Sequence, residues 1–114
     1  MISAVIPVWK PVDWTSFDVV KTMRWRIKPS KVGHAGTLDP FAEGVLMLCT
    51  GKYTKKVESI MNQEKEYIAN IILGSETDTL DSKGSVIKTS IIPDFNKTRL
   101  ESILNKFTGE YLQT

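Results

Sequence analysis

The chain has 114 residues, of which 41% are hydrophobic and 25% are charged, and its net charge is +2. This size fits one small domain or part of a larger one, and the composition is typical of soluble globular proteins. No apolar run approaches the roughly 20 residues of a membrane helix, and residues 1–7 lack the basic region that begins a signal peptide. We therefore expect no membrane insertion and a cytoplasmic location.

Positive charge is concentrated in the first half of the chain. Residues 1–56 contain nine Lys or Arg against four Asp or Glu, a net charge of +5, whereas residues 57–114 contain six against nine, a net charge of −3. The cations lie on both sides of a glycine-containing stretch at residues 31–44. Such a surface attracts a phosphate backbone, although ordinary solvated lysines are the alternative interpretation.

The N-terminal third predicts a strand followed by a helix. Residues 4–9 are β-branched and aromatic enough for a short strand. Thr15 or Ser16 can cap a helix, Asp18 in its first turn suits the helix dipole, and Pro29 ends it. The apolar face of this helix is expected to comprise Phe17, Val20, Met23 or Arg24, and Ile27. Trp25, between two arginines, either packs as a core or rim residue or stacks on a base.

Residues 31–44 predict a loop, because three glycines and Pro40 leave no uninterrupted run for a helix or strand. The loop contains His34, the only histidine of the chain, and Asp39, whose backbone angles are restrained by the proline that follows it. The apolar run 45–49 then predicts a buried strand on which the loop is anchored, with Cys49 as a structural thiol.

The second half predicts further elements of both kinds. Thr54 can cap a short helix, residues 67–73 form a largely apolar interior strand, residues 77–84 are a polar turn, and a strand begins at Gly84. Another strand can open at residues 111–112. An amphipathic helix ended by Gly109 is predicted from the spacing of Leu100, Ile103, Leu104 and Phe107.

These elements favour an α+β fold in one unit. Several connections are too short for helical crossovers, so a mixed, mostly antiparallel sheet flanked by helices is expected rather than a doubly wound parallel sheet.

The order of residues in the loop is more specific than its composition. The run Gly33-His34-Ala35-Gly36-Thr37-Leu38-Asp39-Pro40, followed by Ala42-Glu43-Gly44-Val45-Leu46, resembles the catalytic loop of the TruB family, the tRNA pseudouridine-55 synthases. The one small departure is Ala35, where a threonine is frequent. Further similar pieces occur in the family's order at Lys10-Pro11, Thr15-Ser16, Lys65-Glu66-Tyr67, Leu73-Gly74, Thr77-Asp78-Thr79 with Asp81, and Phe107-Thr108-Gly109.

The resemblance implies the pseudouridine synthase fold and conversion of uridine 55 in the T-loop of tRNA to pseudouridine. Asp39 matches the family's catalytic aspartate, and attack on the base, attack on the sugar and proton abstraction from the sugar all remain open. The reaction needs no external oxidant or group donor, so no cofactor or metal is implied. The target base must leave its stack before a carboxylate can reach it.

The resemblance also implies supporting roles for three residues. Tyr67 packs on the flipped base, His34 contacts the nucleotide or the loop from which it is flipped, and Lys10 braces the site. Without the resemblance, Tyr67 would be interpreted as a core tyrosine and His34 as a solvated side chain.

The family continues past the segment matched here. We therefore expect residues 1–114 to be the N-terminal part of the catalytic domain, without its remainder and the C-terminal RNA-binding domain, and to be inactive in isolation. The partner implied is the T-arm of tRNA. The rival interpretation is a non-catalytic RNA-binding module, in which the basic first half docks a phosphate backbone and Asp39 only caps a turn.

Overall fold

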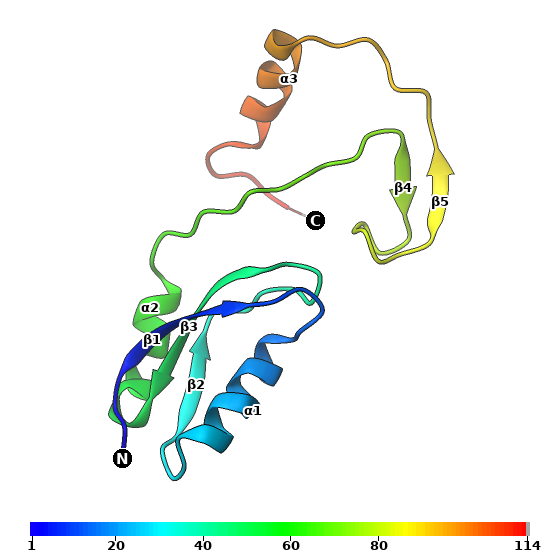
Figure 1. Ribbon diagram of the computed structural model, residues 1–114. Helices are drawn as coiled ribbons and strands as arrows, with labels where there is room; N and C mark the ends of the chain where they lie inside the picture. The colour runs from blue at the N-terminus through cyan, green and yellow to red at the C-terminus, as the bar shows by residue number, and fades with distance from the viewer. Residues whose placement is uncertain (114) are drawn as a thin grey trace. The chain divides into compact units, whose positions relative to one another are not determined.

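The computed structural model describes residues 1–113 and has the expected α+β architecture, with antiparallel strand pairing throughout the described chain (Figure 1). Two compact units, Met1–Ala69 and Asn70–Thr114, divide the chain. Within residues 1–113 every buried side chain lies between Lys10 and Thr50. The first unit therefore contains the core.

The first unit is built on a three-stranded sheet. Its order is β1 (Val5–Lys10), β3 (Gly44–Thr50) and β2 (Val32–Ala35), with the apolar strand β3 in the centre. The register pairs Val5 of β1 with Cys49 of β3 and Lys10 with Gly44. On the other side, β2 runs antiparallel to β3 from Val32↔Thr50 to Ala35↔Met47.

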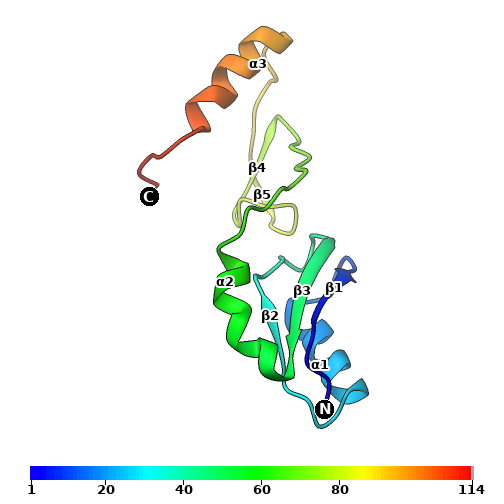
Figure 2. The same cartoon turned by 90° about the vertical axis from the view of Figure 1, so that its left-hand side faces the viewer.

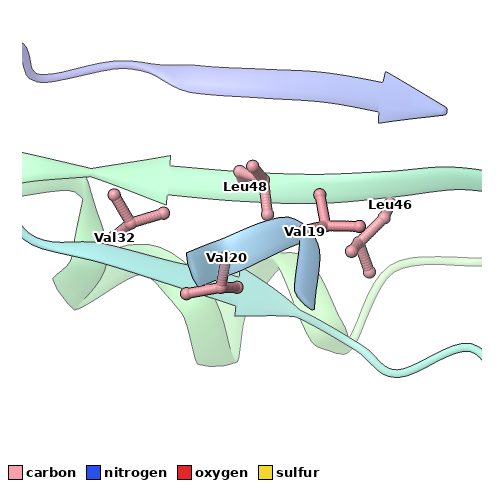
Figure 3. Packing of buried hydrophobic residues seen from close by; sticks show 5 residues of the cluster. All are labelled: Val19, Val20, Val32, Leu46 and Leu48. Atoms are coloured by element: carbon pink, nitrogen blue, oxygen red, sulfur yellow. The ribbon is translucent and has the colours of Figure 1, made fainter. Parts of the chain in front are cut away.

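The helix α1 (Ser16–Arg26) covers one face of this sheet (Figure 1). It begins with a capping box, in which the Thr15 hydroxyl accepts from the Asp18 N–H and the Asp18 carboxylate accepts from the Thr15 N–H. The core cluster joins α1 to both neighbouring strands, as Figure 3 shows for Val19, Val20, Val32, Leu46 and Leu48. Burial of these aliphatic side chains holds the unit together.

The 3₁₀ helix Gly51–Lys56 and the helix α2 (Val57–Met61) lie on the opposite face of β2 (Figure 2). Because side chains alternate along a strand, Gly33 faces away from Val32 and its core neighbours. A methyl group on Gly33 would lie 3.7 Å from Val57 of α2, so this glycine lets the helix pack closely.

The second unit consists of a hairpin and a helix. Its elements are β4 (Ser75–Thr77), β5 (Val86–Thr89), α3 (Lys97–Leu104) and the 3₁₀ helix Asn105–Phe107. A polar turn joins the two strands, as expected, and Asp81 in that turn accepts from the Thr79 hydroxyl at 2.7 Å and the Lys83 N–H at 2.8 Å. The bond from Thr79 lowers the pKa of the Asp81 carboxyl.

Two predictions about strands were wrong. Residues 67–73 are extended but unpaired, and an isolated apolar run cannot become a strand without neighbours to accept its hydrogen bonds. Conversely, Val32–Ala35, expected as loop, forms β2, because pairing with β3 outweighs the glycine it contains. Residues 111–112 are likewise outside any strand.

Three predictions about helices also need correction. Phe17 is 58% exposed, and Val19 takes its expected place on the buried face of α1. Trp25 is 72% exposed, which excludes a core role within the described chain. Thr54 does not cap α2. Its hydroxyl donates to the Gly51 carbonyl at 2.8 Å, inside the 3₁₀ helix that directly follows β3. The helix near the C-terminus is confirmed as α3, but it ends at Leu104, and the 3₁₀ helix Asn105–Phe107 lies between it and Gly109.

Candidate active site

The candidate active site is the loop at residues 36–43, which joins β2 to β3. Its path bends twice through backbone conformations that favour glycine, at Gly36 (φ +93°) and Gly44 (φ +143°). Between them the Ala42 N–H donates to the Asp39 carbonyl at 3.0 Å and closes a turn. The Asp39 side chain is exposed, so its carboxylate can meet a ligand while the main chain beneath it is fixed.

The residues on both sides of Asp39 are tied to the connection between β1 and α1. The buried Ser16 hydroxyl accepts from the Leu38 N–H at 3.0 Å and lies 3.2 Å from the Leu38 carbonyl. On the other side, the Asp13 N–H donates to the Pro40 carbonyl at 2.7 Å. These bonds fix the main chain immediately before and after the candidate catalytic carboxylate.

Lys10 reinforces the same connection from inside the fold. Its side chain at the end of β1 is fully buried, and its ammonium donates to the carbonyls of Pro11 (2.7 Å), Trp14 (2.6 Å) and Pro40 (3.3 Å). A buried ammonium is stable only when its donors are satisfied, and these three acceptors satisfy them. The expected bracing position of Lys10 therefore has a geometric basis.

His34 lies on β2, just before the loop. Its Nδ1 is 2.5 Å from the Gly36 carbonyl oxygen, which can only accept, so Nδ1 carries the proton and donates. In the neutral ring Nε2 is then the acceptor. The half-buried ring lines a surface hollow together with Arg24 and Lys31, and the Arg24 guanidinium donates to the Val32 carbonyl at 3.2 Å.

Tyr67 is the expected site residue that the structure does not bring to the others. It is 64% exposed on the extended segment after α2, and among residues 1–113 no hydrogen bond joins its side chain to the loop. Its neighbour Lys65 lies closer to the loop, because the Lys65 Cε is 3.9 Å from the position that a methyl group on Gly36 would take. The Lys65 ammonium donates to the carbonyls of Met61 and Gln63 at the end of α2.

Sequence reasoning missed Ser16 and Asp13 as supports of the loop. The sequence predicts Thr15 or Ser16 as the helix cap, and only Thr15 has that role. A signal was present, since a serine directly after a cap is available for another partner, but the partner is 22 residues away in sequence.

Within the described part of the chain no group of three or more His, Cys, Asp or Glu could hold a metal ion, and no helix is long and apolar enough to cross a membrane.

Comparison with known proteins decides the family. A profile described as TruB family pseudouridylate synthase (N terminal domain) matches residues 24–114. The chain belongs to the TruB family. The relatives it matches include proteins named tRNA pseudouridine synthase B from Clostridium tetani (45% identical over 112 residues), Francisella tularensis (42% over 113) and Listeria welshimeri (41% over 112).

These TruB relatives are longer than the chain. In each case 98% of this chain is covered, but only 39% of the Clostridium protein and 37% of the other two. The chain thus spans less than two-fifths of the length of the TruB relatives it matches, and the match includes the loop that presents Asp39.

Proposed function

We propose that this chain is the Asp39-bearing part of a tRNA pseudouridine synthase that acts on uridine 55 of the T-loop. The observation that carries the proposal is the fixing of the main chain on both sides of an exposed Asp39, by Ser16 and by Asp13 with Lys10, in a member of the TruB family. The names of the relatives support tRNA as the substrate.

The chemistry is an isomerisation in which no atom is added from outside. The bond from the ribose to the base nitrogen breaks, the uracil turns, and a new bond joins the ribose to a ring carbon, whose proton is lost while the nitrogen gains one. Asp39 acts at this point as a nucleophile or as a base towards the sugar. The reaction uses no cofactor or metal.

Base flipping assigns roles to the neighbouring side chains. An extruded uracil needs a stacking surface, and the exposed ring of Tyr67 can provide one. The Nε2 of His34 can accept a hydrogen bond from the nucleotide or its loop, since Nδ1 is engaged with Gly36. Lys10 acts indirectly, by holding the Pro40 carbonyl beside Asp39.

The proposal is tested by Asp39→Asn, which keeps the size of the side chain but removes the nucleophile or base. The variant is made in a chimera in which residues 1–113 of this chain replace the matching segment of the Clostridium tetani relative. We expect kcat for pseudouridine formation in unmodified tRNA to fall at least about a hundredfold, with the Kd for tRNA within about twofold of the parent.

Glu58→Gln is the matched control, because Glu58 is an exposed carboxylate of α2, outside the loop. It should retain the parent's turnover. Turnover of Asp39→Asn within tenfold of the parent would remove Asp39 from the mechanism, and RNA binding without any pseudouridine formation by the parent chimera would favour the non-catalytic RNA-binding module.

A further inference from the structure

The exposed side of α1 and the residues next to it combine aromatic rings with cations. Trp14, Phe17 and Trp25 are 42%, 58% and 72% exposed. They line one surface hollow with the cations Lys21, Arg24, Arg26 and Lys28 and the carboxylates Asp13 and Asp18. Four cations against two carboxylates give the hollow a net charge of +2. We call this set the α1 face.

The α1 face continues towards the candidate active site. Arg24 lines both this hollow and the second hollow that contains Lys31 and His34. Its guanidinium is held to the Val32 carbonyl of β2 at 3.2 Å, so it is a fixed cation between the two. No described Asp or Glu lines the second hollow, and its charged lining residues, Arg24 and Lys31, are both cations.

Spacing along the helix explains why these side chains form one surface. Phe17, Lys21 and Trp25 follow one another at intervals of four residues, so they lie on one stripe of α1. The buried stripe carries Val19 and Val20 instead. An aromatic ring therefore stands one turn away from a lysine along the exposed side.

We propose that the α1 face is a second RNA-binding surface, on which a base of the RNA partner stacks on Trp25 while its phosphates contact Lys21 and Lys28. The proposal rests on the proposed function for the identity of its partner. Proteins bind RNA strands by this combination, because every base has a face that can stack on an aromatic ring and every linkage carries a phosphate.

The composition of the α1 face favours RNA over a protein partner. Aromatic residues and arginine are common at protein interfaces, so their presence on the α1 face fits either an RNA or a protein partner. Lysine, in contrast, is depleted at protein interfaces. The α1 face and the hollow beside it contain Lys21, Lys28 and Lys31. Lysine is an ordinary phosphate contact, so the lysines distinguish the two partners.

The test measures binding of fluorescein-labelled, unmodified tRNA to the 114-residue chain by fluorescence anisotropy over a series of salt concentrations. Trp25→Ala should weaken binding about tenfold by removing the stacking surface. The double variant Lys21→Gln/Lys28→Gln should reduce the slope of log K against log salt by about 1.5, the value for two phosphate contacts.

Matched control variants separate the α1 face from general effects of charge and exposed rings. Lys88→Gln/Lys106→Gln removes the same charge from exposed positions of the second unit, and Trp9→Ala removes an exposed ring from β1. Both should bind within about twofold of the parent. Far-UV circular dichroism and thermal unfolding of every variant confirm that the fold is retained.

The proposal is overturned if the parent chain does not bind the tRNA, if the α1 variants bind like the parent, or if the controls lose as much affinity as the α1 variants. It is also overturned if the α1 variants abolish self-association in gel filtration but leave RNA binding unchanged, which would make the face a protein interface. Failure of the proposed function has a different signature, the absence of Asp39-dependent pseudouridine formation in the chimera.

Discussion

Lys10 illustrates how one buried cation organises the surroundings of an exposed carboxylate. Its ammonium donates to three carbonyls that belong to the segment after β1 and to the residue after Asp39. Water cannot replace these bonds, because the side chain is fully buried. At the scale of single residues, the position of the candidate site therefore depends on a buried side chain.

Replacing this lysine should cost stability as well as loop order. Lys10→Met keeps the apolar stem but leaves three carbonyls without their donor, so we expect the free energy of unfolding to fall by about 3 kcal/mol. Urea denaturation of the 114-residue chain measures the change. Lys52→Met, at an exposed position, should change the stability by less than about 0.5 kcal/mol. Equal stability of the two variants would contradict the bracing role of Lys10.

Tyr67 is the opposite case, an exposed aromatic residue whose proposed role does not depend on packing. Because its side chain is exposed, Tyr67→Leu should change the stability of the chain by less than about 0.5 kcal/mol. In the chimera the same substitution should lower kcat/KM about tenfold through lost stacking, whereas Tyr67→Phe, which keeps the ring, should stay close to the parent.

Tyr111→Leu is the control, since Tyr111 is also exposed. A loss of stability in Tyr67→Leu with unchanged turnover would make Tyr67 a packing residue.

At the scale of elements, α1 has two separate functions at its N-terminus. Thr15 caps the helix, while Ser16, the first helical residue, is turned inwards to Leu38 of the loop. The start of the helix and the position of the loop are thus set by adjacent residues. A change in the first turn of α1 is expected to reach the loop through Ser16.

The capping box gives α1 a pH dependence. The hydrogen bond from the Thr15 hydroxyl, at 2.7 Å, lowers the pKa of the Asp18 carboxyl below its ordinary value. A carboxyl with a lowered pKa in the folded state stabilises the fold above its unfolded pKa, and this contribution is lost as the pH falls through the folded pKa. We expect the thermal midpoint of the parent to fall more steeply with acidification than that of Asp18→Asn.

Thermal unfolding between neutral pH and acid measures this difference. Thr15→Ala is the companion variant, because it removes the hydroxyl that is the main cause of the lowered pKa and should flatten the profile in the same direction. Identical profiles for the parent and both variants would show that the capping box is not the source of the pH dependence.

At the scale of the whole molecule, the two units differ in how much they bury. The first unit has an aliphatic core between α1 and the sheet, whereas the described residues of the second unit are exposed or half-buried. Apolar side chains in the second unit, such as Ile91 and Leu112, lie in water. Large exposed apolar surfaces of this kind commonly belong to interfaces.

We expect the 114-residue chain alone to bind T-arm RNA weakly and in a salt-dependent manner, with no detectable pseudouridine formation. The physical reason is that Asp39 is exposed to water, whereas catalysis by a carboxylate benefits from a site that excludes it. Incubation of the chain with T-arm RNA, followed by quantification of pseudouridine, tests this, with the chimera as the active control. Robust conversion by the chain alone would show that these residues suffice.

The sequence alone determined the elements that depend on local chemistry. Thr15 and Asp18 predicted the start of α1, the apolar run 45–49 predicted the buried strand β3, and the spacing of Leu100 to Phe107 predicted α3. The order of residues around Asp39 was specific enough to indicate the family. Each of these signals lies within a few residues along the chain, where capping, periodicity and turn preferences act.

Only the tertiary structure decided which extended segments became strands and what holds the loop. Val32–Ala35 is a strand because β3 lies beside it, and residues 67–73 are not, because no described strand pairs with them. The ties from Ser16 and Lys10 to the loop span 22 and 30 residues. A hydrogen bond between distant residues depends on where the core brings the chain together, and that position is not encoded in any local pattern of residues.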